Sequence, residues 1–207
     1  MQANLIKHSA SMGVMLGLTQ ADLLLTYLNL IQKWNRVHNL TAVRDPEKML
    51  SLHILDSLSV SPYIEVSTLL DVGSGAGLPG IPLAIINPLM HITLTDSNKK
   101  KAAFQQQAVI ELGLTNVTIA SGRVEDIQPE QKFDGIISRA FSEISLFINL
   151  TRHLKASDAY WYAMKGICPV QELNTLPDGI IPISIRALNV PMLDAQRHLV
   201  ILKEVDG

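Results

Sequence analysis

The first third of the chain carries apolar side chains at helical spacing. Between Thr19 and Trp34, apolar residues recur every three or four positions, which predicts an amphipathic helix. Thr19 is the expected N-cap of this helix, and Asp22 stands three residues later, as in a capping box. Residues 35–41 are mostly polar and of types that favour turns, so we expect the helix to end there.

A second helix is predicted after this polar segment. Asp45 is suited to the N-cap and Pro46 to the first helical position, and apolar residues then continue until Pro62. We expect residues 1–65 to form an N-terminal helical extension that packs on a larger domain formed by residues 66–207.

The spacing of apolar residues changes at position 68. Short apolar runs now alternate with helical stretches, a pattern typical of β-α-β units and a parallel sheet. The last two apolar runs have no helix between them, so they predict a terminal antiparallel hairpin. The expected strands are 68–72, 91–96, 117–120, 133–138, 159–164, 181–190 and 197–203, and the expected helices are 80–87, 98–113 and 142–154.

Composition and charge narrow the class of protein. The 207 residues are 47% hydrophobic and 17% charged, which indicates a globular fold and excludes disorder. A net charge of −2 argues against a non-specific nucleic-acid coat protein, because such proteins need many phosphate contacts. The one cysteine, Cys168, permits neither an internal disulfide nor a cysteine-based zinc site, which favours a reducing, cytoplasmic compartment.

Nothing in the sequence indicates an obligate dimer, so we expect a monomer.

One apolar stretch has the length of a membrane span. Residues 72–90 carry no formal charge and are about as long as a bilayer-crossing helix. The stretch contains four glycines and three prolines, which would break such a helix. We therefore expect a soluble protein that does not bind membranes.

The sharpest motif is a glycine cluster that follows the first predicted strand. Glycines after a strand let a ligand approach the backbone closely, at the edge where open α/β sheets bind ligands. Gly75 to Gly80 match G-x-G-x-x-G, and Asp96 lies 19 residues past Gly77, so a dinucleotide is one interpretation. With Asp71 included, the motif becomes D-x-G-x-G-x-G, which resembles class I S-adenosylmethionine-dependent methyltransferases. We favour the methyltransferase, because an acid near the loop suits the cationic methionine end of that cofactor.

Acidic residues after the next two strands extend this predicted site. Asp96 ends the second strand, and we favour a contact to the ribose hydroxyls over a role as N-cap of the helix near Asn98. Val124 and Glu125 follow the third strand, where related folds enclose the adenine. Glu125 has a plainer alternative as a solvated acid.

Several motifs outside the loop are more specific than the loop itself. Residues 53–57 (His-Ile-Leu-Asp-Ser), 77–82 (Gly-Leu-Pro-Gly-Ile-Pro) and 138–141 (Ser-Arg-Ala-Phe) together resemble one family, the bacterial 16S rRNA guanine-N7 methyltransferase G family, formerly called glucose-inhibited division protein B. Leu52 departs from the family pattern, which has arginine there. Further matches are 34–35, 39–41, 44–45, 71–73, 123–125, 133–135, 165–166 and 197–200.

The resemblance implies a fold, a reaction and a set of site residues. The fold is a Rossmann-like methyltransferase domain with a mostly parallel seven-stranded sheet, and the reaction is transfer of a methyl group from S-adenosylmethionine to N7 of a guanine in the 530 loop of 16S rRNA. The substrate is expected to be the 30S subunit or an assembly intermediate. The predicted cofactor-binding residues, including the loop and Asp96, are Gly73, Ser74, Gly75, Leu78, Asp96, Val124, Glu125 and Arg139.

The chemistry of N7 methylation sets the remaining expectations. Guanine N7 carries a free lone pair, so we expect no general base, no catalytic triad and no metal; alignment and electrostatics suffice. Arg139 and Lys165 are the predicted catalytic residues, which position the base through its O6 atom. Arg123, Lys165 and Arg197 are predicted to bind RNA phosphates.

Two further predictions concern packing and the competing functions. His53 and Asp56 share a helical face, and we expect both to serve packing. A methyltransferase for a small molecule or a protein is the alternative on the same fold, and an NAD(P)-binding module is the weaker one.

Overall fold

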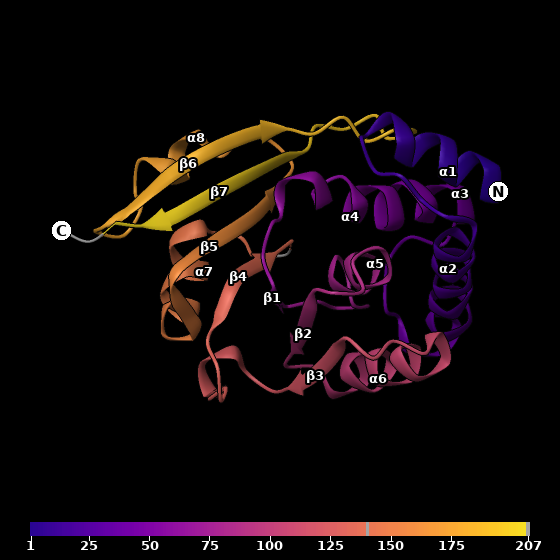
Figure 1. Ribbon diagram of the computed structural model, residues 1–207, viewed down its shortest axis with the longest axis horizontal. Helices are drawn as coiled ribbons and strands as arrows, with labels where there is room; N and C mark the ends of the chain where they lie inside the picture. The colour runs from indigo at the N-terminus through magenta and orange to yellow at the C-terminus, as the bar shows by residue number, and fades with distance from the viewer. Residues whose placement is uncertain (140, 206–207) are drawn as a thin grey trace.

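A single mixed β-sheet forms the centre of the protein. The computed structural model describes residues 1–139 and 141–205, and its strands lie in the order β3-β2-β1-β4-β5-β7-β6 (Figure 1). The first five strands are parallel, and β7 is antiparallel to both β5 and β6, which confirms the predicted parallel sheet and terminal hairpin. The strands are β1 Thr68–Val72, β2 His91–Asp96, β3 Val117–Ser121, β4 Phe133–Ser138, β5 Lys155–Lys165, β6 Ile180–Ala187 and β7 His198–Glu204.

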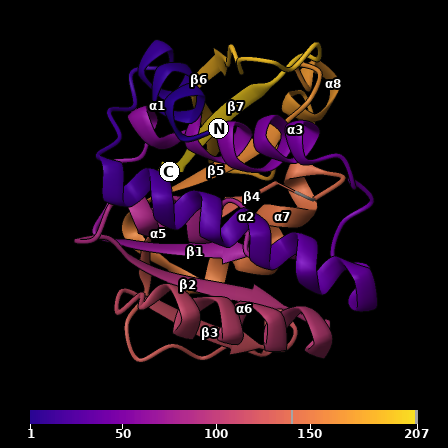
Figure 2. The same cartoon turned by 90° about the vertical axis from the view of Figure 1, so that its right-hand side faces the viewer.

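Helices cover both faces of the sheet. Helices α2, α5 and α6 lie on one face and α7 on the other, as Figures 1 and 2 both show. Neighbouring strand residues point to opposite faces, so Leu69 belongs to one core cluster and Leu70 to the other. The helices are α1 Gln2–Ser11, α2 Leu18–His38, α3 Pro46–Met49, α4 Asp56–Leu58, α5 Gly80–Ile86, α6 Lys99–Leu112, α7 Ile144–Thr151 and α8 Val170–Leu173.

The N-terminal helices pack directly on the sheet's helical layer. Leu5 of α1 and Tyr27 of α2 are fully buried in the same core cluster as Leu94 of β2. The expected N-cap at Thr19 is wrong: α2 begins earlier, with Gly17 at its N-cap. The Gly17 backbone N–H donates to the Gln20 side chain at 3.0 Å, which is the reverse half of a capping box, and the N-cap residue itself offers no side-chain acceptor.

The second predicted helix is present but irregular. Asp45 caps it as expected, and its carboxylate accepts from the backbone N–H groups of Glu47 and Lys48. Its middle is a π-helical segment, η1 Leu50–Leu55, which joins α3 to α4. A π-helical turn changes the faces that successive side chains occupy, and such turns are frequent at functional sites.

The remaining differences from the predicted elements are local. Strand β5 begins four residues earlier than expected, and β6 ends three residues earlier. Helix α8 was not predicted; it is a single turn between β5 and β6. Short 3-10 turns lie at η2 Ser61–Tyr63, η3 Val124–Asp126 and η4 Arg152–Leu154.

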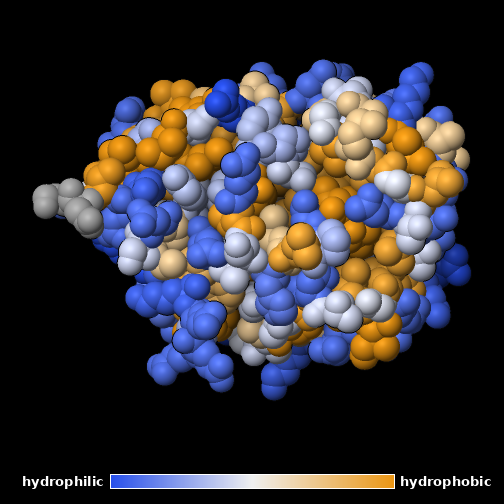
Figure 3. All heavy atoms as spheres, viewed as in Figure 1, coloured by the Kyte–Doolittle hydropathy of each residue, from blue (hydrophilic) through white to orange (hydrophobic). Residues whose placement is uncertain are grey.

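Apolar side chains also reach the surface along the sheet edge. Figure 3 shows them over β6, where Ile181, Ile183 and Ile185 are 41–51% exposed. Among the described residues, no helix is both long and apolar enough to cross a membrane.

Candidate functional site

The glycine loop adopts a conformation that only glycine reaches without strain. Gly73, Gly75 and Gly77 all have positive φ angles between 60° and 86°. The backbone N–H groups of Gly73 and Ser74 donate to the carbonyl oxygen of Thr95, at 2.9 and 3.1 Å, so the loop is tied to the end of β2. The loop therefore lies at the carboxyl edge of the parallel strands, as expected.

Two helices hold the loop from behind. The buried Tyr27 hydroxyl of α2 donates to the carbonyl oxygen of Ala76. The Gln105 side chain of α6 donates to the Ser74 hydroxyl at 2.9 Å and to the Gly75 carbonyl oxygen at 2.8 Å. These bonds join elements far apart in sequence and leave the loop little freedom.

Asp71 supports the loop from beneath. Its carboxylate is fully buried and accepts from the backbone N–H of Gly80 at 2.8 Å. Burial raises the pKa of Asp71 to about 7, although the bond from Gly80 and the charge of Arg139 oppose that shift. Asp71 does not line the cavity that opens beside Asp96, so its expected effect on the methionine end of the cofactor stays a prediction.

Asp96 is held at the carboxyl end of β2 with its carboxylate toward the loop. One oxygen accepts from the backbone N–H of Gly75 at 2.9 Å, and the other accepts from the backbone N–H of Asn98 at 2.8 Å. Asn98, not Asp96, is the N-cap of α6. The ammonium of Lys101 lies 3.9 Å from the Asp96 carboxylate.

A cavity of about 430 Å³ opens beside Asp96, and we call it the Asp96 cavity. Four predicted cofactor-binding residues line it: Gly73, Asp96, Val124 and Glu125. The chemistry of its walls fits a nucleoside with a charged tail, because carboxylates and a glycine backbone face apolar side chains, and its volume is in the range of small-molecule sites. The other lining residues are Val72, Thr95, Ser97, Lys101, Gly122, Arg123, Phe141 and Leu150.

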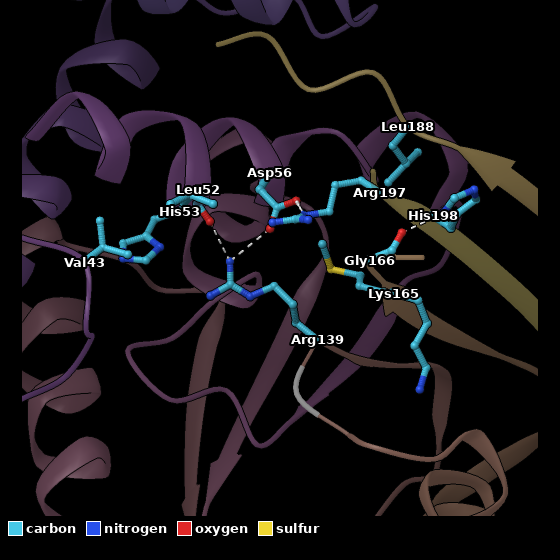
Figure 4. A pocket seen from close by; sticks show the side chains of 11 residues that line it. Val43, Leu52, His53, Asp56, Arg139, Lys165, Gly166, Leu188, Arg197 and His198 are labelled. Atoms are coloured by element: carbon cyan, nitrogen blue, oxygen red, sulfur yellow. Dashed lines mark hydrogen bonds and ion pairs between the residues drawn. The ribbon is translucent and has the colours of Figure 1, made fainter. Parts of the chain in front are cut away.

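A second cavity, of about 360 Å³, lies around Asp56, and we call it the Asp56 cavity (Figure 4). The buried Asp56 carboxylate pairs with two arginines: Arg139 Nη1 at 3.2 Å and Arg197 Nε at 2.9 Å. Arg139 also donates to the Leu52 carbonyl oxygen at 3.0 Å. The lining residues are Val43, Leu52, His53, Asp56, Arg139, Met164, Lys165, Gly166, Leu188, Arg197 and His198.

His53 is a neutral group in the wall of this cavity. Burial, together with the nearby charge of Arg139, lowers the pKa of His53 to about 4. Its Nε2 atom lies 3.0 Å from the Thr41 hydroxyl, whereas its buried Nδ1 atom has no hydrogen-bond partner among the described residues.

Lys165 is engaged away from the arginines. Its ammonium donates to both carboxylate oxygens of Glu172, at 3.0 and 2.8 Å, and to the carbonyl oxygens of Phe141 and Ser142. In Figure 4 the side chain points away from Asp56. Glu172 also accepts from the backbone N–H of Ile144 at 2.7 Å, so this one carboxylate holds both Lys165 and the start of α7.

The predicted residues thus separate into three places. Arg139, Lys165 and Arg197 come together in the Asp56 cavity, while Arg123 lines the Asp96 cavity instead. Four predicted cofactor residues do not line the Asp96 cavity, and their cofactor contacts stay predictions. One is Arg139, which lines the Asp56 cavity. The other three are Ser74 and Leu78, which are buried, and Gly75, which bonds to Asp96.

Sequence reasoning missed several residues of both cavities. Phe141 and Lys101 line the Asp96 cavity. Phe141 belongs to the 138–141 motif of the family resemblance and Lys101 to the first turn of the predicted helix 98–113, but neither was assigned to the cofactor. Asp56 was expected to serve packing, but it pairs with arginines 83 and 141 positions away, which spacing along the chain could not reveal. No cluster of metal-ligating side chains occurs within residues 1–139 and 141–205.

The chain is similar to known proteins over most of its length. Residues 20–200 match the family model described as rRNA small subunit methyltransferase G. A protein of Methylobacillus flagellatus named ribosomal RNA small subunit methyltransferase G is 54% identical, over 98% of both chains. The protein of that name from Chromobacterium violaceum is 51% identical, over 96% of this chain and 95% of its own.

The fold is also found in solved structures. A SAM-dependent methyltransferase from Aquifex aeolicus superimposes with a TM-score of 0.59 over 81% of this chain and 97% of its own. The two sequences are 20% identical, so this likeness concerns the fold alone.

Proposed function

Because this chain belongs to the rRNA small subunit methyltransferase G family, we propose that it transfers the methyl group of S-adenosylmethionine to N7 of a guanine in the 530 loop of 16S rRNA. The observation that carries the proposal is the pair of cavities at the carboxyl edge of the sheet. One cavity is rimmed by acids beside the glycine loop, and the other contains three cationic side chains.

The Asp96 cavity is the proposed cofactor site. Asp96 would accept from the ribose hydroxyls, because its carboxylate is already oriented by Gly75 and Asn98. Val124 and Glu125 would border the adenine, and the open backbone at Gly73 leaves room for the methionine end. When bound, the cofactor supplies a methyl group on a positively charged sulfur.

The Asp56 cavity is the proposed guanine site. Glu172 neutralises Lys165, so the two guanidinium groups of Arg139 and Arg197 meet the single carboxylate of Asp56. The remaining positive charge suits an electron-rich base and the phosphates beside it. The two cavities share the segment after β4, since Arg139 lines one and Phe141 lines the other. This segment would bring the base and the methyl group together.

The proposed chemistry needs positioning rather than proton transfer. The N7 lone pair would form the bond to the methyl carbon while the bond from that carbon to sulfur breaks, which leaves S-adenosylhomocysteine and a positively charged guanine. Guanidinium groups donate hydrogen bonds, so Arg139 or Arg197 would contact O6 and leave N7 free. Lys165 could contact O6 only after its ammonium left Glu172, so we assign that contact to the arginines and give Lys165 a positioning role.

A labelling experiment tests the proposal. Purified protein would be incubated with tritiated S-adenosylmethionine and either 30S subunits or naked 16S rRNA from cells that lack the gene. We expect labelled 7-methylguanosine in the 530 loop. Whichever RNA is the better substrate would show at which stage of ribosome assembly the protein acts. We expect it to act as a monomer.

Controls separate the alternatives. An Arg139→Gln variant should bind S-adenosylhomocysteine and transfer little methyl. If wild-type protein binds S-adenosylhomocysteine but labels neither RNA, the rRNA substrate is wrong, and a small-molecule or protein substrate takes its place.

A further inference from the structure

A third cavity, of about 200 Å³, lies between the second half of α2 and the loop before α3. We call it the Arg44 cavity. It is lined by Gln32, Asn35, Arg36, Arg44 and Met49, so its polar groups are two guanidinium groups and two carboxamides. No acidic side chain is among its lining residues.

The charge of this cavity is available to a ligand. Arg36 and Arg44 are both exposed. Among the described residues Arg36 has no ion-pair partner, and Arg44 donates one hydrogen bond, at 3.3 Å, to the neutral side chain of Asn39. The neighbouring acid Asp45 is occupied as the N-cap of α3, and Glu47 is exposed beside it.

The segment that carries Arg44 also forms a wall of the Asp56 cavity. The buried Asn35 side chain accepts from the Thr41 backbone N–H at 3.0 Å and donates to the Val43 carbonyl oxygen at 3.4 Å, which fixes the segment on α2. The Thr41 hydroxyl meets His53, and Val43 lines the Asp56 cavity (Figure 4). Arg44 is the next residue, so the two cavities lie on either side of one short, anchored segment.

We propose that the Arg44 cavity is a phosphodiester-binding subsite for the rRNA strand that carries the target guanine. The proposal rests on the function proposed above. A guanine inside the Asp56 cavity belongs to a continuous polynucleotide, so the phosphates on either side of it must lie on the protein surface around the cavity. Arginine binds phosphate oxygens in a forked geometry, and the carboxamide of Gln32 adds a neutral hydrogen-bonding group. Asn35 contributes by anchoring the segment that carries Arg44. Contacts of this kind fix the register of the strand without reading its sequence.

The test compares two variants with equal loss of charge. The double variant Arg36→Gln/Arg44→Gln removes the proposed contacts, and Lys7→Gln/Lys132→Gln removes two exposed charges elsewhere. The measurement is the affinity for a 530-loop RNA fragment at several salt concentrations. For single-stranded RNA each phosphate contact contributes about 0.7 to the slope of log affinity against log salt, so we expect the arginine variant to lose about 1.4. Its RNA affinity should fall roughly tenfold at low salt, with unchanged affinity for S-adenosylhomocysteine.

A charge-preserving variant gives a second, independent readout. Arg36→Lys/Arg44→Lys keeps both positive charges, so it should retain most of the salt slope. If the arginine-to-glutamine and control variants lose equal affinity, or if the lysine variant behaves like the glutamine variant, the subsite assignment is wrong. These outcomes are distinct from failure of the proposed function, because that failure would already appear as absent rRNA labelling by the wild-type protein.

Discussion

At the scale of single residues, Asp71 is a carboxylate in an unfavourable place. The carboxylate has no exposed surface. One of its oxygens accepts from the Gly80 N–H, and the other has no partner among the described residues. The negatively charged form is therefore poorly stabilised. Because this carboxylate accepts from the backbone N–H of Gly80, its protonation state bears directly on the end of the glycine loop.

The first prediction concerns pH. Burial raises the pKa of Asp71 to about 7, whereas that of an unfolded-state aspartate lies near 4. Between about pH 4 and 7 the folded state therefore holds a proton that the unfolded state has released, so this residue lowers the free energy of unfolding as pH rises. Asp71→Asn cannot titrate, and its carbonyl can still accept from Gly80.

Urea unfolding of wild type and Asp71→Asn from pH 4 to 8 measures this effect. The stability of wild type minus that of the variant should fall with rising pH, by as much as about 4 kcal/mol. His53 works in the opposite direction, because burial lowers its pKa to about 4, and the subtraction removes its contribution. Asp158→Asn, at an exposed position, is the control. A difference that stays constant with pH would contradict the assignment.

The second prediction concerns Gly80. A Cβ atom there would lie 2.2 Å from Leu94 Cδ2 and 2.8 Å from Asp71 Oδ2. Gly80→Ala should therefore lower the free energy of unfolding by about 1–3 kcal/mol and weaken S-adenosylhomocysteine binding, since the loop must shift. Denaturation and calorimetric titration give the two quantities.

Gly113→Ala is the matched control for Gly80→Ala. Gly113 ends α6 with a φ of 63°, and a Cβ atom at this position would meet no other atom within 4 Å. Its substitution should cost about 1–2 kcal/mol through backbone strain alone and leave cofactor affinity unchanged. Equal effects of the two variants on cofactor affinity would rule out the proposed link between packing at Gly80 and the site.

At the scale of elements, the contact between α8 and α7 holds one wall of the Asp96 cavity. Glu172 of α8 accepts from the first backbone N–H of α7 and from Lys165 of β5, and Lys165 in turn holds the carbonyl oxygens of residues 141 and 142. An anion at the N-terminus of a helix is also favoured by the helix dipole. One carboxylate thereby fixes the segment that places Phe141 in the Asp96 cavity.

The third prediction follows from this contact. Glu172→Gln keeps the size of the side chain and removes its charge, so it should loosen the segment after β4 and weaken S-adenosylhomocysteine binding several-fold. Asp158→Asn is the control, because it removes the exposed partner of an ion pair with Lys203. The Asp158 side chain is 94% exposed, so the substitution should change the free energy of unfolding by less than about 0.5 kcal/mol. Titration calorimetry on both variants is decisive: unaltered binding by Glu172→Gln would show that the wall does not depend on this pair.

At the scale of the whole molecule, cofactor binding should be visible as stabilisation. A ligand that binds only the folded state at 100 times its dissociation constant adds about 2.7 kcal/mol to the free energy of unfolding. For a chain of this size, we expect S-adenosylhomocysteine to raise the melting temperature by about 5–10 °C. NADH at the same concentration should produce no shift, and a shift with NADH alone would revive the dinucleotide interpretation.

The pattern along the chain was sufficient for the order and type of most elements. Alternating apolar runs and glycine positions depend on local periodicity and backbone sterics, which act within a few residues. The parallel sheet, the hairpin and the loop after β1 were therefore predictable. The family resemblance likewise rests on short motifs of consecutive residues, which can be read directly from the sequence.

Only the tertiary structure decided which charges meet. Asp56 pairs with Arg139 and Arg197 because α4, β4 and β7 converge at one edge of the sheet, and Lys165 meets Glu172 through the unpredicted helix α8. It also placed Asp71 under the loop rather than in the cavity. Such pairings depend on distances between side chains separated by up to 141 positions, and the sequence leaves these distances undetermined until the chain has packed.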